Sequence, residues 1–588
     1  MRWLTVWTAT TSIWSSWSVV YAGTATLQDE DFREDLYIRP LPDGKVLSHF
    51  DFTMIASHGR WEGIKVEDGI ASYQTSLVPR SLAAIVRSFD VEEVYLSLTA
   101  GRWDYTRWGE TVGDGSPSGG EIYAWLSNFE GDDEDSIRKK WTGLTNALGG
   151  LFCSSLNKLD DKITVSPNRS DTFTPTLSLS KGQPFFHALL PLERPCTENL
   201  TPFISLLPCR SKAGLATLLG GPSKLFDANW QRLQVHIVKN VESAELEIKL
   251  SMEVVQDPVR MTLSAGSQRR RDWSFESLFG RSIKHSCPVA SSSIIKVDLR
   301  NEDEEKGYVL EPKTSEIQLP TDPYAVYDVN NVALPLSLHM RWPVMRPEGF
   351  EFPRSYTPAS IYAERINTGY GLERAILGIA IWNTENTATN VTWLEEWPAW
   401  IKVFMHSMRV TVGNVQVPND QIVQKMLYRQ AHTRGRPTLI EASVNLPSQS
   451  VVRIMIDVDR AYLRYTDYPP DAMRGFDIPS GIVLTKSVDE DGNCKSRRVY
   501  TTSTLLDMPT PDFSMPYNVI ILTCTVIALF FGSIFNMMTR TWMLVDMREK
   551  PTKQAAEETP VISRGMTQDT EAIQANGRTL RPRKASEH

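Results

Sequence analysis

The feature that most constrains this 588-residue chain is a stretch near its C-terminus, residues 517–538, that contains no charged side chain. As an α-helix it would be about 30 Å long, which matches the hydrocarbon thickness of a bilayer. A buried helix of a soluble core is the alternative, but such a helix normally carries ionisable residues on one face, and this stretch has none. The sequence therefore predicts one transmembrane helix at 517–538.

The charges on either side of this stretch predict its orientation. Asp507 and Asp512 precede it, and the basic residues that follow it are Arg540, Arg548, Lys550 and Lys553. Because positive charge is retained on the cytosolic side of a membrane, we expect the C-terminus in the cytosol. The segment 539–588 is polar and poor in aromatic residues, so it is expected to be a disordered cytosolic tail.

Residues 1–22 have the order of a secretory signal peptide. Arg2 comes first, an apolar middle rich in tryptophan follows, and the segment ends in the small residue Ala22, after which we place the cleavage site. A weak buried strand is the alternative, because Thr and Ser dilute the apolar middle. A signal peptide and one C-terminal span together predict a type I membrane protein whose bulk, about 23–515, faces the lumen of the secretory pathway.

Composition limits the classes of protein to which the chain can belong. It is 41% hydrophobic and 10% aromatic, which is enough apolar surface to drive folding. The formal charge of −8 argues against a nucleic-acid-binding protein, which needs an excess of Lys and Arg. A mean hydropathy of −0.26 excludes a membrane protein with many spans.

Alternation of apolar and polar residues predicts that the luminal part is mostly β-strand. Residues 245–254 place five apolar side chains on one face and charged or hydroxyl side chains on the other. The same pattern recurs at 233–238, 408–417 and 452–458, and turns with Pro and Gly lie between such runs. Strands with one polar face fit antiparallel sheets, and short strands separated in this way are typical of β-sandwiches.

Two helices are predicted before residue 160. Their apolar stripes are Leu82, Ile85, Val86 and Phe89, with Ser81 as the cap, and Ile137, Trp141, Leu144 and Leu148. We therefore expect a mainly β protein with an α+β N-terminal part, divided into an α+β region at 23–230 and a β-sandwich-like region at 231–515. Two alternatives stay open, a boundary near 301–323 and a continuous two-layer body.

The cysteine count bears on partners. Cys524 lies in the predicted span, and the five that would face an oxidising lumen are Cys153, Cys196, Cys209, Cys287 and Cys494. Because five is odd, at least one of them is expected to be free or joined to another chain. A buried unpaired thiol satisfies the same count.

N-glycosylation sequons give a second test of the compartment. Two open acceptors, Asn168 and Asn390, lie in polar surroundings. A third sequon at Asn199 is followed by Pro202, so we expect it to be a poor acceptor. We predict glycans at Asn168 and Asn390.

A catalytic interpretation depends on pairs of Cys and His. His187 precedes Cys196, and His285 lies two residues before Cys287, which makes an independent luminal thiol hydrolase the alternative function. A catalytic pair is defined by geometry and by a third, orienting group, and the chain has neither a GxSxG nor an HExxH motif. It also has no CxxC and no zinc-type Cys/His spacing, so we predict no catalytic residue, no metal and no cofactor. A single anchor, a large β-rich body and an odd number of cysteines better fit a scaffold subunit.

Seven motifs are spread along the chain. They are EDLYIRPLP at 34–42, FHALLP at 186–191, CTENLTP at 196–202, LPCRSKAGL at 207–215, DWS at 272–274, GYGL at 369–372 and PDFSMPYNVI at 511–520. In sequence and in order they resemble the PIG-T family, which is a subunit of the glycosylphosphatidylinositol (GPI) transamidase.

The resemblance implies a non-catalytic scaffold in the endoplasmic reticulum (ER) membrane, in the complex that attaches GPI anchors to precursor proteins. In that family the catalytic thiol and histidine belong to a separate caspase-like subunit, which is held through an intermolecular disulfide. The linking cysteine opens the CTENLTP motif, which makes it Cys196 here. Cys153, Cys209 and Cys287 also occupy family positions and are candidates for intrachain disulfides of open connectivity, whereas Cys494 has no family counterpart.

Other partners follow from the same resemblance. They are the further transmembrane subunits of the complex, the membrane itself, the GPI lipid and the precursor protein. No nucleic acid is expected. An ER glycoprotein of another complex is the remaining alternative to a transamidase subunit.

Overall fold

The computed structural model describes residues 30–57, 77–127, 133–166, 172–173, 175–176, 183–240, 245–264, 269–300, 307–313, 316–318, 323–343, 349–369, 374–468, 471–488, 494–510, Asp512 and 514–542. The predicted signal peptide, most of the predicted tail and the sequon at Asn168 lie outside these residues. The chain forms two compact units, Met1–Thr510 and Pro511–His588.

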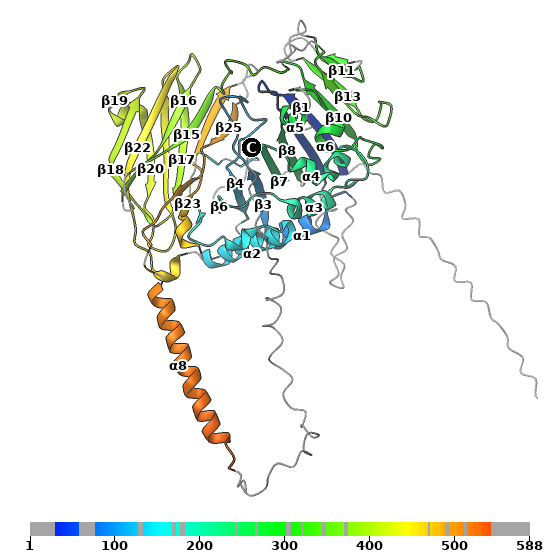
Figure 1. Ribbon diagram of the computed structural model, residues 1–588. Helices are drawn as coiled ribbons and strands as arrows, with labels where there is room; N and C mark the ends of the chain where they lie inside the picture. The colour runs from blue at the N-terminus through cyan, green and yellow to red at the C-terminus, as the bar shows by residue number, and fades with distance from the viewer. Residues whose placement is uncertain are drawn as a thin grey trace, which may run out of the picture. The chain divides into compact units, whose positions relative to one another are not determined.

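An eleven-stranded sheet forms the N-terminal part of the larger unit (Figure 1). Its strands are β1 (Glu30–Pro40), β2 (Val46–Ala56), β3 (Val91–Ala100), β4 (Gly119–Leu126), β5 (Thr164–Val165), β6 (Phe185–Leu190), β7 (Trp230–Asn240), β8 (Glu245–Gln256), β10 (Ser292–Asp298), β12 (Glu316–Gln318) and β13 (Tyr324–Asp328). They lie in the order β12-β13-β10-β1-β2-β8-β7-β3-β4-β6-β5. Strands β1 and β10 are parallel, and the other neighbours, such as β1 and β2, are antiparallel.

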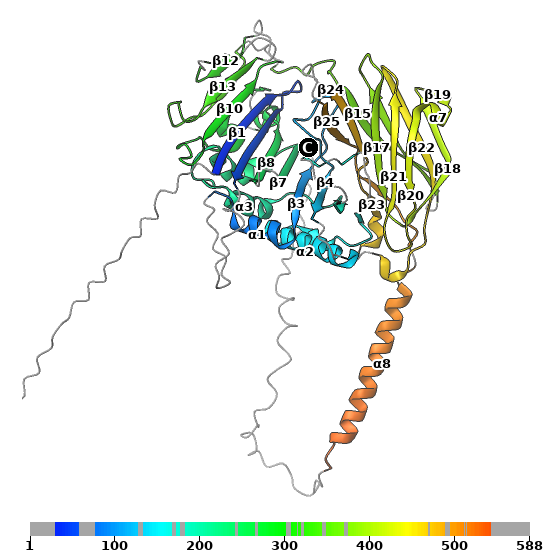
Figure 2. The same cartoon turned by 180° about the vertical axis from the view of Figure 1, so that it is seen from behind.

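The two faces of this sheet differ in chemistry, as the alternating pattern predicts. In β8, Leu246, Ile248 and Leu250 point into the main core, where they pack with residues of the helices α1 (Arg80–Ser88), α2 (Glu134–Phe152) and α3 (Thr197–Leu206). Figures 1 and 2 show these helices side by side along the sheet. The opposite face carries polar groups such as Glu253 of β8 and Arg232 of β7, and these two are buried as well.

The two predicted helices are present, but one predicted cap is wrong. Helix α2 begins as a capped helix does, because the side chain of Asp133 accepts a hydrogen bond from the backbone N–H of Ser136 at 2.8 Å. Helix α1 begins at Arg80 after Pro79, with no side-chain cap, so Ser81 lies inside the helix and does not cap it. The fixed φ of proline suits a residue at the entry to a helix.

Shorter elements complete this part of the larger unit. They are η2 (Ser155–Lys158), η3 (Leu215–Gly220), α4 (Pro222–Leu225), α5 (Pro258–Ser264) and α6 (Phe275–Phe279), and a small sheet of β11 (Val309–Glu311), β14 (His339–Arg341) and β9 (Trp273–Ser274).

A β-sandwich of two five-stranded sheets follows. One sheet has the order β15 (Ile361–Thr368), β16 (Arg374–Asn383), β22 (Ser450–Arg460), β18 (Ile401–Val412) and β19 (Val415–Val417). The other has the order β20 (Val423–Arg429), β21 (Thr438–Leu446), β17 (Thr389–Trp397), β24 (Ile482–Val488) and β25 (Cys494–Tyr500), and α7 (Asn419–Ile422) leads into β20. Alternate residues of β16 and β22, such as Leu377 and Ile454, fill the space between the two sheets.

A two-stranded ribbon lies at one end of the sandwich. It consists of β23 (Phe476–Ile478) and β26 (Thr504–Leu506), and two single turns precede it, η5 (Tyr465–Asp467) and η6 (Ala472–Arg474).

The predicted fold class is confirmed, and two of its details differ. A division at residue 230 does not separate two sheets, because β7 and β8 lie beyond it and yet pair with β3 and β2. The change to the sandwich comes between β14 and β15. The alternating run at 408–417 is two strands, because a turn at Gly413, with φ of +60°, reverses the chain.

The described residues of the smaller unit, Asp512 and 514–542, include the helix α8 (Ser514–Thr539). Among the residues that the structure describes, it is the one helix that is long and apolar enough to cross a membrane. It includes the whole of the predicted span.

Candidate functional site

Cys196 begins helix α3 and exposes its thiol. It is the N-cap residue and is not disulfide-bonded. Its backbone N–H donates to Oδ1 of Asn199 at 2.7 Å, while Nδ2 of Asn199 donates to the carbonyl oxygens of Phe152 at 2.7 Å and Cys153 at 3.2 Å. The Asn199 side chain thus joins the start of α3 to the end of α2 and fixes the backbone that carries Cys196.

Cys153 is a second exposed thiol in the same neighbourhood. It ends α2 with φ of 52° and is also not disulfide-bonded. Its carbonyl oxygen and the N–H of Cys196 bind the same side-chain amide, so the backbones of the two cysteines meet at Asn199. Asn199 itself is 1% exposed, which places this third sequon out of reach of a glycan.

Cys209 and Cys287 form a disulfide, with their Cα atoms 5.9 Å apart and a sequence separation of 78. The bond ties the loop after α3 to the segment before β10. Of the three cysteines that the sequence offers for intrachain pairing, the structure therefore joins these two and leaves Cys153 free.

His187 is held inside the protein between two carboxylates. Its Nδ1 lies 2.6 Å from Oε1 of Glu396, its Nε2 lies 3.1 Å from Oε1 of Glu121, and its side chain is fully buried. Burial alone would lower the pKa of this imidazole, but the two carboxylates outweigh burial and raise the pKa to about 9. A buried, protonated imidazole does not serve as a base for the exposed thiol of Cys196.

The second candidate pair, Cys287 and His285, does not form a nucleophile and base either. Cys287 is bonded to Cys209, so it supplies no thiolate, and the carbonyl oxygen of His285 accepts a hydrogen bond from Gly214 N–H at 2.8 Å. Neither pair that the sequence suggests for a thiol hydrolase has the geometry of a nucleophile and its base.

Further polar contacts join the N-terminal sheet to the sandwich around His187. The hydroxyl of Tyr500 donates to Oε1 of Glu121 at 2.8 Å, and the guanidinium of Arg498 lies 2.7 Å from Oδ2 of Asp114. That guanidinium also lies over the rings of Tyr95, Tyr123 and Phe173, 5.0–5.7 Å from their centres. We call this set of contacts the buried seam. It connects the N-terminal sheet to the sandwich.

A polar cavity of about 600 Å³ opens beside the seam. The cations that line it already have carboxylate partners, Arg232 with Glu253 at 2.5 Å, Lys249 with Asp51 at 2.6 Å and Arg498 with Asp114 at 2.7 Å. His49 also lines the cavity, and its Nδ1 lies 2.6 Å from the same Oε1 of Glu253 that Arg232 contacts.

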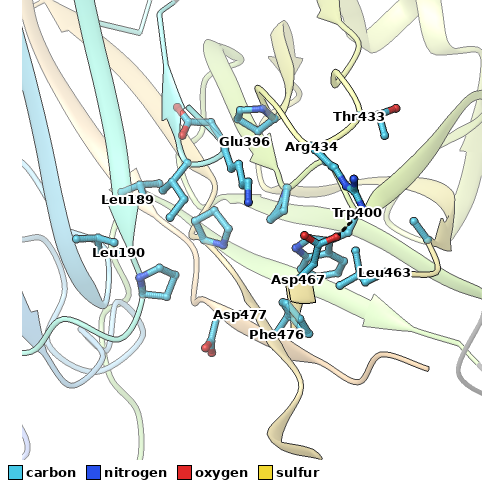
Figure 3. A pocket seen from close by; sticks show the side chains of 18 of the residues that line it. Leu189, Leu190, Glu396, Trp400, Thr433, Arg434, Leu463, Asp467, Phe476 and Asp477 are labelled. Carbon is cyan, nitrogen blue, oxygen red and sulfur yellow. Dashed lines mark hydrogen bonds and ion pairs between the residues drawn. The ribbon is translucent and has the colours of Figure 1, made fainter. Parts of the chain in front are cut away.

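A second pocket, of about 590 Å³, is mainly apolar and lies between β6 and the ribbon end of the sandwich (Figure 3). Leu189 and Leu190 of β6 face Trp400, Leu463 and Phe476 across it. Its rim carries an ion pair between Arg434 and Asp467, with 3.1 Å between Nη2 and Oδ2. The pocket thus combines an apolar lining with a few polar side chains at its rim.

Asn390 lies on β17 with its side chain exposed. A glycan at this position would project into solvent, and glycosylation of Asn390 stays a prediction.

The matching family model decides the identity. The model described as "Gpi16 subunit, GPI transamidase component" matches residues 16–271 and 259–564. The chain belongs to the Gpi16 family. The matches cover the N-terminal sheet, the sandwich and α8.

Relatives in animals and fungi support the membership. The chain is 34% identical over 560 residues to the GPI-anchor transamidase component PIGT of Mus musculus, with 88% of this chain and 91% of the relative covered. It is 34% identical to the Homo sapiens protein of that name, with 88% and 92% covered. It is 28% identical to the GPI transamidase component GPI16 of Saccharomyces cerevisiae, with 89% and 91% covered.

Two of the sequence motifs of this Gpi16 family chain meet at the disulfide. Oε1 of Glu34 accepts a hydrogen bond from the N–H of Leu215 at 3.1 Å. A Cβ atom on Gly214 would lie 2.3 Å from that carboxylate and 2.8 Å from Cβ of Cys287, so only glycine fits, and its φ is +68°. The first and fourth motifs are therefore packed against each other and against the bonded Cys287.

Proposed function

We propose that this chain is the non-catalytic scaffold subunit of a GPI transamidase that attaches GPI anchors to precursor proteins in the ER. It binds and stabilises the caspase-like catalytic subunit, in part through an intermolecular disulfide from Cys196. The observation that carries the proposal is the exposed, unpaired thiol of Cys196 at a rigid helix start, in a chain of the Gpi16 family.

The state of the other cysteines supports this choice. Cys209 and Cys287 are bonded to each other, so neither has a thiol to offer a partner. Cys153 is exposed and ends α2, so it is the competing thiol and the natural control. Cys196 alone of these four opens the CTENLTP motif.

A disulfide would act here mainly through concentration. Once the bond forms, the catalytic subunit stays at high effective concentration next to the scaffold, and weak non-covalent contacts are enough to orient it. In the same proposal α8 spans the ER membrane, the larger unit lies in the lumen and the C-terminus lies in the cytosol. The other transmembrane subunits, the GPI lipid and the precursor protein then meet this chain through the complex.

Substitution of single cysteines tests the proposed intermolecular disulfide. Tagged full-length protein is extracted from its own cells in detergent with an alkylating agent present, and is run on a non-reducing gel. We expect the unchanged chain and Cys153→Ser to run as a heavier species that contains a cysteine protease, and Cys196→Ser to run as the single chain. Mass spectrometry of the heavier species should return a cross-linked peptide that includes Cys196.

Two outcomes contradict the proposal. If the heavier species persists in Cys196→Ser and is lost in Cys153→Ser, the link is formed by Cys153 and not by Cys196. Turnover of a peptide or ester by the purified chain alone, lost on Cys196→Ser, would make the protein an independent thiol hydrolase.

A further inference from the structure

A cluster of exposed, mainly apolar side chains lies at the ribbon end of the sandwich. Its members are Tyr462, Tyr465, Met473 and Leu505, which are 73%, 43%, 81% and 45% exposed. We call this set the ribbon-end surface. Exposed large side chains gathered in one place mark a surface that something else covers.

Hydrogen bonds tie this surface to the chain that leads into α8. The hydroxyl of Tyr468 donates to the carbonyl oxygen of Pro509, and Nη1 of Arg460 donates to the carbonyl oxygen of Asp507 at 2.7 Å. Strand β23 pairs with β26, with Phe476 opposite Leu506. The segment 460–478 is therefore fixed to residues 504–509.

Chain length then limits how far this surface can lie from the membrane. Pro509 precedes Ser514, the first residue of α8, by five residues, and five extended residues span at most about 18 Å. This limit holds for every direction that α8 takes. A helix that enters the bilayer at Ser514 therefore keeps the ribbon-end surface close to the lipid headgroups.

The chemistry of the surface fits the headgroup region. Tyrosine is enriched where membrane meets water, because its ring is apolar and its hydroxyl is polar, and Met and Leu side chains add apolar area. Between Arg460 and Asp477 three arginines balance three aspartates, so attraction to anionic lipid contributes little. The contact would be hydrophobic rather than electrostatic.

We propose that the ribbon-end surface rests in the headgroup region of the bilayer and so fixes the angle of the larger unit to the membrane. The inference rests on the proposed topology, in which α8 spans the membrane. The occupant is lipid of no particular charge, because the surface has apolar and aromatic groups and no net charge.

Depth measurements on the full chain test this contact. The chain is placed in nanodiscs of phosphatidylcholine, with Cys153→Ser, Cys196→Ser, Cys494→Ser and Cys524→Ala, so that the bonded Cys209 and Cys287 are the native cysteines that remain. An environment-sensitive fluorophore is attached through Tyr462→Cys or Met473→Cys, through Leu529→Cys in α8, or through Val415→Cys as a matched control. Val415 is 67% exposed and lies on β19, at the other end of β22 from Arg460.

The expected result is a blue-shifted emission at 462 and 473 that nitroxide lipids quench, and neither effect at 415. The unlabelled chain should also form photocrosslinks between 461–475 and a lipid with a reactive headgroup. Quenching at 529 without quenching at 462 and 473 overturns this inference alone, and no quenching at 529 means that the topology itself fails. Protection at 473 that appears only when the other subunits are added assigns the surface to a protein partner and also overturns the inference.

Discussion

Nδ1 of His187 lies 2.6 Å from Oε1 of Glu396, and this contact joins two sheets through residues that have a sequence separation of 209. His187 belongs to β6 of the N-terminal sheet and Glu396 to β17 of the sandwich. On the other side of the ring, Glu121 of β4 completes the buried arrangement. The imidazole of His187 is therefore one of the buried contacts that join the two parts of the larger unit.

Replacement of this imidazole should loosen the larger unit. His187→Gln leaves the carboxylates of Glu121 and Glu396 buried without their cation, and breaking such a pair costs on the order of 3 kcal/mol. We expect a clearly lower Tm for the detergent-solubilised full chain, followed by tryptophan fluorescence. His406→Gln, on an exposed residue of β18, is the control and should melt as the unchanged chain does.

The same site predicts a dependence on pH. A histidine whose pKa is raised to about 9 on folding stabilises the folded state fully below its unfolded pKa, near 6.5, and this contribution is lost as pH rises through 9. The gap in Tm between the unchanged chain and His187→Gln should therefore narrow from pH 6.5 to pH 9.5. A gap that widens over this range would contradict a charged His187.

How far the sequence predicts this fold depends on whether a signal is local. The alternation at 245–254 predicts β8 because one face of that strand packs in the core and the other carries polar groups. Pairing is not local, since β8 and β7 insert between β2 and β3, and the pattern of one strand does not identify its neighbour. The boundary at residue 230 failed for this reason.

The candidate site divides in the same way. The odd cysteine count predicts a thiol without a partner in the chain, but a count does not give connectivity. Cys209 and Cys287 have a sequence separation of 78, so no local pattern shows that they are in contact. The sequence suggests His187 as a candidate base because Cys196 is near it in sequence. Its carboxylates come from β4 and β17, and no local pattern shows that they meet at one ring.

Loss of the disulfide should lower the stability of the N-terminal sheet. Removing a native bond that closes a long loop costs about 2–5 kcal/mol, chiefly because the unfolded chain regains freedom. Cys209→Ala with Cys287→Ala should lower the Tm, and Cys153→Ala, at an exposed free thiol, should leave it unchanged. Equal melting of all three proteins would show that the bond contributes nothing.

Gly378 of β16 is a position where one added methyl group should destabilise the sandwich. A Cβ atom there would lie 2.0 Å from the carbonyl oxygen of Ile454 on the neighbouring β22. To relieve this clash, the backbone of one strand would have to shift, which would disturb the pairing of β16 with β22. Gly378→Ala should cost about 2 kcal/mol or more. Gly150→Ala on α2 meets nothing within 4 Å and should stabilise the chain by roughly 0.5–1 kcal/mol through helix propensity. Chemical unfolding of both variants tests the contrast, and a Gly378→Ala chain as stable as the unchanged one would contradict it.

Glycan mass tests both the luminal topology and the burial of Asn199. Asn390 is exposed on β17, so Asn390→Gln should remove one glycan that endoglycosidase also removes. Thr201→Ala destroys the sequon of Asn199 without touching its buried side chain, and it should leave the gel mobility unchanged. A shift on Thr201→Ala would show that Asn199 is reached during synthesis, and no shift on Asn390→Gln would count against the luminal orientation.

Glu34 predicts a loss of stability between acidic and neutral pH. Burial raises the pKa of its carboxyl to about 7, although Ser293 Oγ and the N–H of Leu215 donate to it and oppose the rise. A carboxyl with a raised pKa binds its proton more tightly in the folded state, so folding is favoured below pH 4.5 and weakens as pH rises to 7. The shift corresponds to a loss on the order of 3 kcal/mol.

Glu34→Gln keeps an acceptor for both donors and does not titrate. Melting curves from pH 4.5 to pH 7.5 should therefore show a smaller decline for Glu34→Gln than for the unchanged chain. Ser293→Ala removes a donor that favours the carboxylate, so its decline should extend to higher pH. Parallel curves for all three proteins would mean that folding does not raise the pKa of Glu34, and they would contradict this prediction.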